Sequence, residues 1–313
     1  MVEDNEIKAQ ISPFAIREGE IKTFDGKDGY VSMNQIVHKI NIGHITDIHF
    51  AILELVNEFE FITSRQLYQM LEIKGIDPKS QDKLNNKLEQ LVKSKILTRY
   101  YFTSEEGKGI YRIYCLEKMG KYLLNSKEID CKWQPSDNTK PVAMIKKRLA
   151  GNQVLIAYLR KVKAFDSYIV KPAITAKVTG KTFKASGGCV KLTKNGKSIQ
   201  FLFEAVRREE DWQKKLVDKM RLYKDFYENF VPMDSGFQTM PQLIFICEDE
   251  KHAVETFKEI VKNNLEIEQI KLYFTTDLKQ NSNTLENTLI EFKLDPNTNK
   301  YKVENVELKL LGM

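Results

Sequence analysis

Apolar residues recur at helical spacing in three successive stretches between Ile45 and Val92. The inward positions are Ile48, Ile52, Leu55, Val56 and Phe59; Leu67, Met70 and Leu71; and Leu84, Leu88, Leu91 and Val92. One apolar stripe on each stretch predicts three amphipathic helices that share a core. Thr63 or Ser64 is a suitable cap for the second helix, because its hydroxyl can accept a hydrogen bond from a free backbone N–H.

Two β-rich runs follow these helices, Ile96–Phe102 and Ile110–Leu116. The polar residues 103–109 between them include two glycines, which is typical of a hairpin tip. Three helices followed by a hairpin predict a winged helix-turn-helix domain over residues 44–125.

Residues 1–43 are less regular. Ile21–Phe24 and Tyr30–Met33 flank residues 25–29, which contain two glycines and two aspartates, so a small hairpin is one expectation. An arm that packs on the next domain, or a tail that binds a partner, would have the same pattern.

The polar residues 126–141 predict a linker, and residues 142–313 a second domain. It opens with a helix, Val142–Lys163. The expected elements after it are β-runs at Ser167–Val170, Thr182–Phe183, Cys189–Leu192 and Ile199–Val206, a helix at Glu209–Phe230, a strand at Leu243–Cys247, a helix at His252–Lys262, a strand at Ile270–Phe274, and a hairpin of Thr288–Leu294 with Tyr301–Leu310. This order predicts an α+β protein with a mixed sheet flanked by helices.

The net charge of +6 is unevenly distributed. Residues 141–230 hold 20 Lys and Arg against 8 Asp and Glu, whereas residues 231–313 hold 9 against 14. A basic block of this kind indicates a polyanionic partner, most often nucleic acid. The alternative is a solvated surface rich in lysine.

Double-stranded DNA is the predicted partner of the winged domain. In such domains the second helix of the motif enters the major groove. Its outward residues here are Lys79, Ser80, Lys83, Asn86, Lys87 and Gln90. Further expected DNA contacts are Arg99, Lys108 and Arg112 on the hairpin, and the basic cluster Lys146, Lys147 and Arg148. Winged domains also dock proteins, so a docking scaffold stays open.

The order of elements in the second domain is also that of the PD-(D/E)XK nuclease core. In that core an Asp on one strand and a Glu on the next hold Mg²⁺, which activates water. Glu204 occupies the Glu position, but Ser186 or Gly187 replaces the Asp and Val206 replaces the assisting Lys. Lys214 or Lys215 could substitute for that lysine. We therefore predict a degenerate domain without cofactor, in which Glu204 pairs with a helix lysine; a divergent Mg²⁺-dependent nuclease using Glu204 is the alternative.

In order along the chain, these segments resemble the replication-relaxation family of bacterial plasmids and integrative elements. The resemblance covers about residues 45–280. It rests on the winged segment, on IKKRLAGNQVLIAYL, on FLFEAVRREEDWQKKLVDKMRLYKDFY and on PQLIFICEDEKHAVETF. It implies DNA binding in plasmid replication, relaxation or transfer, with a nuclease-like C-terminal domain. Ser186, Gly187 and Val206 depart from the catalytic pattern, which puts catalysis in doubt rather than the fold.

Other function classes lack their signatures. There is no GxxxxGK loop for ATP, and the Ser186 segment precedes a strand instead of the helix of a nucleophile elbow. His38, His44 and His49 lack the spacing of a metal site, and no metal is predicted. The four cysteines are expected to be buried thiols, and no signal peptide or membrane span is apparent.

The sequence thus predicts a cytoplasmic, non-catalytic DNA-binding protein of a mobile element. Replication or relaxosome proteins are candidate partners, and a homodimer is the favoured state. A transcriptional repressor would have the same sequence features.

Overall fold

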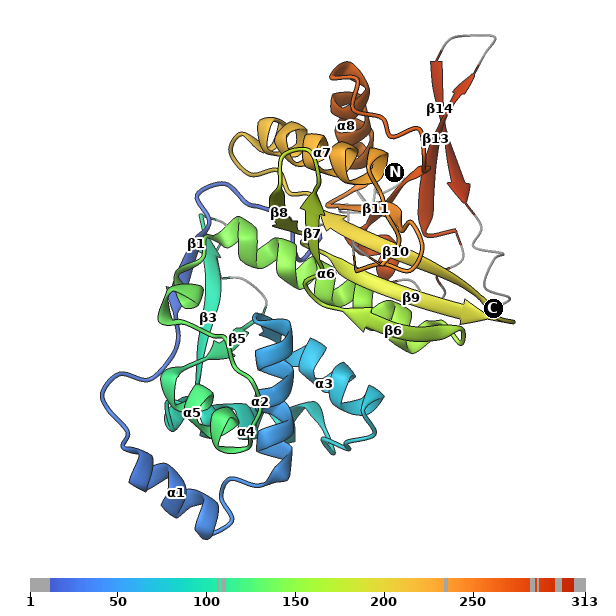
Figure 1. Ribbon diagram of the computed structural model, residues 1–313. Coiled ribbons are helices and arrows are strands. Elements are labelled where there is room, and N and C mark those ends of the chain that lie inside the picture. The colour runs from blue at the N-terminus through green and yellow to red at the C-terminus, as the bar shows by residue number, and fades with distance from the viewer. Residues whose placement is uncertain are drawn as a thin grey trace, which may run out of the picture.

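The computed structural model shows two packed units on either side of one long helix (Figure 1). It describes residues 12–105, 107–108, 111–233, 236–281, 285, 287–295 and 300–306. The long helix is α6, Val142–Lys161, which lies between the N-terminal unit and a large sheet.

The N-terminal unit contains the predicted helices and hairpin strands. Its elements are α2 (Asp47–Phe59), β2 (Ile62–Thr63), α3 (Ser64–Ile73), α4 (Gln81–Lys93), β3 (Leu97–Ser104), β4 (Gly107–Lys108), β5 (Ile113–Leu116) and α5 (Lys118–Ser126). Thr63 caps α3 by accepting a bond from the Gln66 N–H, and the Gln66 side chain accepts one from the Thr63 N–H in return. The apolar stripes of α2, α3 and α4 are buried together, as their spacing predicts.

The hairpin expected within residues 1–43 does not form. Strand β1, Ile21–Phe24, instead pairs antiparallel with β3, so the segment is an arm on the winged unit. Tyr30–Met33 is not a strand, because Ser32 caps a helix, α1 (Met33–Asn41), with a capping box to Gln35.

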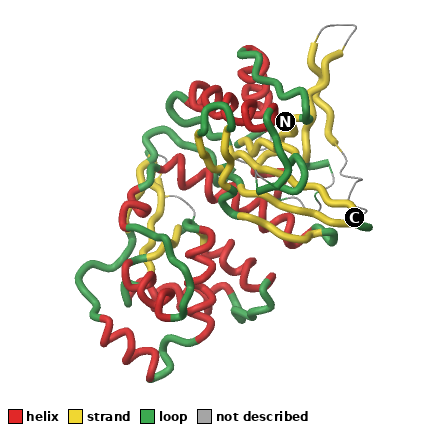
Figure 2. The backbone as a smooth tube through the Cα atoms, in the orientation of Figure 1, coloured by secondary structure: helices red, strands yellow, loops and turns green. Residues whose placement is uncertain are grey.

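The C-terminal unit contains the predicted mixed sheet, with seven strands in the order β14-β13-β12-β11-β10-β9-β6 (Figure 2). The strands are β6 (Phe165–Ile169), β9 (Gly188–Lys194), β10 (Lys197–Ala205), β11 (Gln242–Cys247), β12 (Leu272–Thr276), β13 (Leu289–Asp295) and β14 (Lys300–Val306). Strands β10, β11 and β12 are parallel, whereas β9 and β13 run antiparallel to their neighbours. A separate hairpin joins β7 (Ala173–Ala176), which was not predicted, to β8 (Lys181–Lys184).

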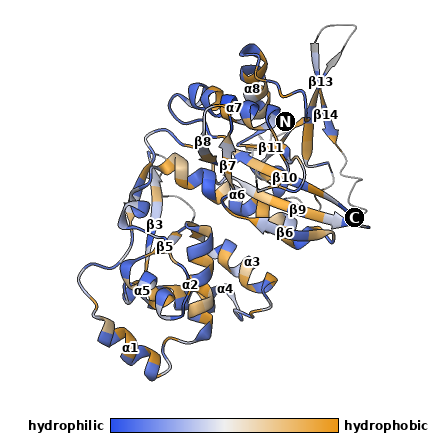
Figure 3. Ribbon diagram, viewed as in Figure 1, coloured by the Kyte–Doolittle hydropathy of each residue, from blue (hydrophilic) through white to orange (hydrophobic). Residues whose placement is uncertain are grey.

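Helices cover both faces of this sheet. α6 packs on β9 and β10, while α7 (Trp212–Glu228) and α8 (Glu250–Lys262) lie on the opposite face. The short helix α9 (Asp277–Gln280) follows β12 and contacts α6. Successive β10 side chains alternate between the two layers, so Phe201 and Phe203 meet Tyr158 of α6 while Glu204 meets Tyr223 of α7. The central strands are correspondingly hydrophobic (Figure 3).

Helix α6 also closes the winged unit. The Gln66 amide donates to Leu149 O (2.8 Å), and the Asn152 amide donates to Phe61 O (2.7 Å). A single hydrophobic core therefore runs from α2 through α6 into β10. Residues 126–141 pack as well, since the Asn138 amide donates to Leu116 O (2.8 Å) from the short helix Pro135–Thr139.

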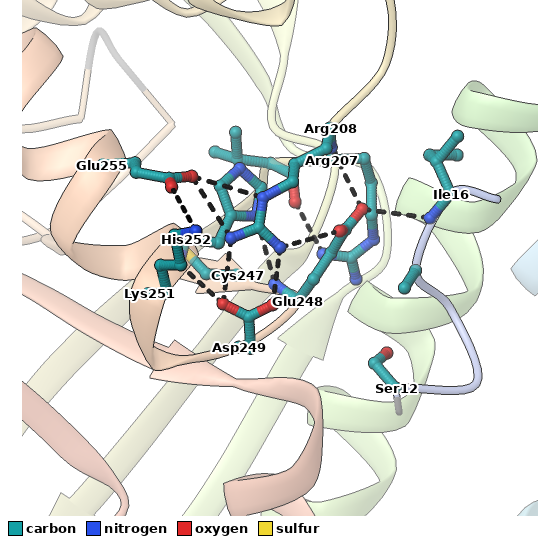
Figure 4. A network of polar contacts seen from close by, with 12 residues as sticks. Ser12, Ile16, Arg207, Arg208, Cys247, Glu248, Asp249, Lys251, His252 and Glu255 are labelled. Atoms are coloured by element: carbon teal, nitrogen blue, oxygen red, sulfur yellow. Dashed lines mark hydrogen bonds and ion pairs between the residues drawn. The ribbon is translucent and has the colours of Figure 1, made fainter. Parts of the chain in front are cut away.

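An N-terminal strap, residues 12–20, crosses from the sheet to the winged unit. The Ser12 hydroxyl donates to Asp277, and the Ile16 N–H donates to Glu248 at 3.1 Å (Figure 4). Tyr111 of the winged unit donates to Pro13 O at 2.9 Å. The strap therefore joins both units through contacts between residues that lie far apart in sequence.

Gly151 allows α6 to approach the loop before β9. A Cβ at this position would lie 2.5 Å from the Gly187 Cα and 2.8 Å from the Ser186 carbonyl oxygen. Gly151→Ala should therefore destabilise the protein by about 1–3 kcal/mol, because backbone overlap outweighs the ~1 kcal/mol gain in helix propensity. Urea denaturation measures the change. Increased stability would show that the loop before β9 moves aside without loss of stability and would contradict this prediction.

Candidate functional site

The outward face of α4 lies over a shallow hollow of about 580 Å³. Five of the six residues predicted on this face line it, namely Lys79, Lys83, Asn86, Lys87 and Gln90. Lys83 and Asn86 are exposed and Lys87 is half-buried. Neither Lys83 nor Lys87 is in an ion pair with a carboxylate of the described residues. These side chains are thus positioned to meet a ligand.

Three neighbours on this face have structural contacts. Ser80 caps α4 by accepting from the Lys83 N–H at 3.2 Å. Gln90 contacts the His49 imidazole at 3.0 Å, and burial is the main cause of the lowered His49 pKa. Lys79 pairs with Asp77 at 2.9 Å. Periodicity predicted their exposure but not these contacts.

The hairpin cations differ from one another. Arg99 is largely covered and pairs with Glu89 and with Asp25, an arm residue 74 positions away. Arg112 also pairs with Asp25 at 2.6 Å but keeps 57% of its side chain exposed. Lys108 lies in β4, and its side chain is outside the described residues. Arg112 is therefore the more accessible of the two arginines.

A larger groove of about 1150 Å³ is lined by α3, α4, the hairpin and the C-terminal half of α6. Amides and guanidinium groups line it, including Arg65, Gln69, Asn85, Gln153 and Arg160, none of which the sequence singled out. Arg65 directly follows the capped start of α3, and Asn85 precedes Asn86. Their position next to predicted residues was the only sequence signal for this groove. The sequence did not indicate that α6 forms its other side.

The basic cluster at the start of α6 is divided by the structure. Lys146 is buried, pairs with Glu20 at 2.5 Å and donates to Ala15 O of the strap. The expectation that Lys146 lies where DNA could reach it was wrong, because the strap covers it. Arg148 is also buried and donates to Val170 O at 2.7 Å. Lys147 pairs with Glu209 and lines a second pocket.

Glu204 is buried at the end of β10, where its carboxylate is fully engaged. It accepts from the Ser186 hydroxyl (2.8 Å), the Ser186 N–H (3.2 Å) and the Tyr223 hydroxyl (2.7 Å). Lys219 lies 3.5 Å away. Burial raises the pKa of Glu204, but Lys219 and these hydrogen bonds outweigh it, so the pKa lies below its usual value.

These surroundings do not fit Mg²⁺. Divalent magnesium needs free carboxylate oxygens, usually from more than one side chain. Glu204 is already surrounded by donors, and no group of three His, Cys, Asp or Glu side chains within the described ranges could hold a metal. The lysine beside Glu204 is Lys219, whereas Lys215 pairs with Glu209 at 2.7 Å and Lys214 is exposed outside the pocket.

A family comparison confirms the resemblance noted in the sequence, but over fewer residues than the 45–280 expected there. Residues 53–239 match the family described as Replication-relaxation. The chain belongs to the replication-relaxation family. Membership in this family suggests a plasmid-associated role. The match runs from within α2 to just before β11 and so includes most of the winged unit, α6 and Glu204.

Other comparisons add little to the family assignment. No curated protein matches the chain. Among solved structures, that of the restriction endonuclease FokI is distantly similar, at 10% identity and a TM-score of 0.27. That match covers 74% of this chain and 43% of the FokI chain, and so low a TM-score carries no argument. In the described part of the chain, no helix is both long and apolar enough to cross a membrane.

Proposed function

We propose that this replication-relaxation protein binds double-stranded DNA through α4 and acts, without catalysis, in the replication, relaxation or transfer of a plasmid or other mobile element, or in the regulation of these processes. The observation that carries the proposal is the hollow over α4, where Lys83, Asn86 and Lys87 are reachable from solvent. α2 and α3 hold α4 through the buried stripe, as the scaffold of a winged helix does.

Each side chain has a distinct role in this proposal. The Lys83 and Lys87 ammonium groups neutralise backbone phosphates, which supplies affinity without sequence preference. The Asn86 amide can pair bidentately with adenine, which supplies sequence preference. Arg112 on the hairpin and Arg65 at the start of α3 lie on the same groove as Asn86 and extend the contact surface.

The double variant Lys83→Ala/Lys87→Ala should bind DNA more weakly and with a shallower salt dependence. Each lost phosphate contact is expected to reduce the slope of log K against log salt by about 0.9. Fluorescence anisotropy on a duplex, over a series of salt concentrations, measures both quantities. Lys132→Ala/Lys251→Ala is the matched control, because both lysines are exposed and neither lines the hollow over α4. An unchanged slope in the double variant would contradict the proposal.

Asn86→Ala tests the sequence preference separately from the overall affinity for DNA. On sites selected from random duplexes by the wild-type protein, it should lose about 1–3 kcal/mol of discrimination at one base pair. The salt slope should stay as in the wild type, since no charge is removed.

The nuclease alternative receives no support from the Glu204 surroundings. We propose that the mixed sheet is a degenerate nuclease-like body that holds the winged unit through α6. Replication or relaxosome proteins as partners, a homodimer, and a repressor or docking role all remain compatible with this surface.

A further inference from the structure

A second pocket, of about 360 Å³, lies where the two units meet. Its walls are the turn between α2 and β2, the first half of α6, the end of β10 and the start of α7. The guanidinium of Arg207, also at this wall, is turned toward Asp277. Apart from Arg207, seven lysines and arginines line the pocket beside two carboxylates, Glu60 and Glu204.

Both carboxylates are already shared among cations. Glu60 pairs with Lys140, lies 2.7 Å from Lys171 and lies 3.7 Å from Arg148. Burial lowers the pKa of Lys171, and the positive charges of Arg148 and Lys140 lower it further, while Glu60 opposes both effects. Lys140 also pairs with Asp137 at 3.0 Å, so three cations at this wall share two carboxylates.

The opposite wall repeats this excess of positive charge. Lys147 and Lys215 share Glu209. Lys219 is near Glu204 at 3.5 Å, but that carboxylate also accepts three hydrogen bonds. Lys184 of β8 is exposed and has no ion pair with a carboxylate of the described residues. The cations thus converge on a space that an anion would neutralise.

We infer that this pocket binds, without a metal ion, the phosphoryl group of a nucleotide, either a free nucleoside monophosphate or the 5′-terminal phosphate of a DNA strand. A phosphate offers several acceptor oxygens and one to two negative charges, which suits lysines arriving from several directions. A divalent cation, by contrast, would be repelled by the same lysines. Met144 and Trp212 add apolar surface to the lining, against which a sugar or base can pack.

The pocket volume limits the ligand. About 360 Å³ lies near the lower end of the range for small-molecule sites, which fits one nucleotide. The inference does not depend on DNA binding by α4, because no residue of α4 lines this pocket.

Isothermal titration of the full chain with dAMP, in EDTA and at constant ionic strength, tests the inference. We expect saturable binding at one site, weakened at least about tenfold in Lys184→Ala/Lys215→Ala. Both side chains are exposed, so their removal leaves the fold intact. Lys132→Ala/Lys251→Ala is the matched control, with two lysines that are 90% and 84% exposed outside the pocket. The Lys83→Ala/Lys87→Ala variant should bind dAMP as the wild type does.

Inorganic phosphate and two oligonucleotides identify the source of the phosphate. Weaker binding of inorganic phosphate than of dAMP supports a contribution from sugar or base. If the protein binds a 5′-phosphorylated strand more tightly than its 5′-hydroxyl counterpart, the ligand is a DNA end. If it binds both strands equally and also binds dAMP, the ligand is a free nucleotide. Binding of dAMP weaker than about 1 mM, equal affinity in the pocket variant, or a requirement for Mg²⁺ would overturn the inference.

Discussion

Replacing Arg207 with alanine is expected to lower the free energy of unfolding by about 3–5 kcal/mol, because it leaves a buried carboxylate without its counter-charge. Arg207 is fully buried and its guanidinium lies 2.8 Å from Asp277, which is also buried. The same guanidinium donates to Val206 O and Ile246 O. Urea denaturation followed by tryptophan fluorescence measures the loss.

The neighbouring arginine provides the control for this prediction. Arg208 pairs with Asp249 and Glu255, but 29% of its side chain is exposed. Because water already screens these pairs, Arg208→Ala should cost only about 1 kcal/mol. Arg207→Met combined with Asp277→Leu should recover part of the loss, since it removes both buried charges. Equal losses of unfolding free energy in Arg207→Ala and Arg208→Ala would show that the buried Arg207–Asp277 pair is no more important for stability than the exposed pairs of Arg208.

The Arg207→Ala variant should also acquire a distinctive pH dependence. Burial raises the pKa of Asp277, and Arg207 opposes that rise. Without Arg207, the folded-state pKa moves further above the unfolded value, so the folded state binds the additional proton. The free energy of unfolding of the variant should therefore fall as the pH rises above about 4. The difference in this free energy between the wild type and the variant should be smaller at pH 5 than at pH 8.

Glu204→Ala is expected to destabilise the protein by about 3 kcal/mol, since it removes the acceptor for Ser186 and Tyr223 at once. The Tyr223 hydroxyl is fully buried and would lose its charged partner. Tyr223→Phe removes one of these bonds and should cost about 1–2 kcal/mol. Urea denaturation of both variants tests the structural role of Glu204.

The same variant separates this role from a nuclease role. A catalytic carboxylate would leave stability largely unchanged on removal and would abolish Mg²⁺-dependent nicking of supercoiled plasmid by the wild type. We expect the reverse, with no nicking by either protein and a clear loss of stability in Glu204→Ala. Nicking by the wild type that disappears in a stably folded variant would establish the nuclease alternative.

The helices of the winged unit were predictable because their signals are local. Apolar residues three and four apart place α3 and α4, and Thr63 was the predicted cap of α3. Ser80 was expected to contact DNA, whereas the structure shows it as the cap of α4. The same periodicity placed Lys83 and Asn86 on the exposed face. Strand β10 was likewise evident from its run of bulky apolar residues.

Features that depend on distant partners were not predictable. α6 is buried on both sides, so it has no single apolar stripe that would reveal its central place. Lys146 looks like a surface lysine until Glu20, 126 positions earlier, is brought beside it. The pairing of β1 with β3 spans about 80 residues, and no local pattern in the arm distinguishes it from a hairpin.

The strap has a consequence for how the protein matures on the ribosome. Ser12 donates its hydroxyl to Asp277, a residue synthesised 265 positions later. At about 5–20 residues per second, the beginning of the polypeptide waits on the order of 10–50 s for this partner to emerge. Lys146 emerges about halfway through that interval, so Glu20 can cover it before Asp277 is available to Ser12. Docking of the strap is therefore a late event in folding, because it requires both Glu248 and Asp277 to have been synthesised.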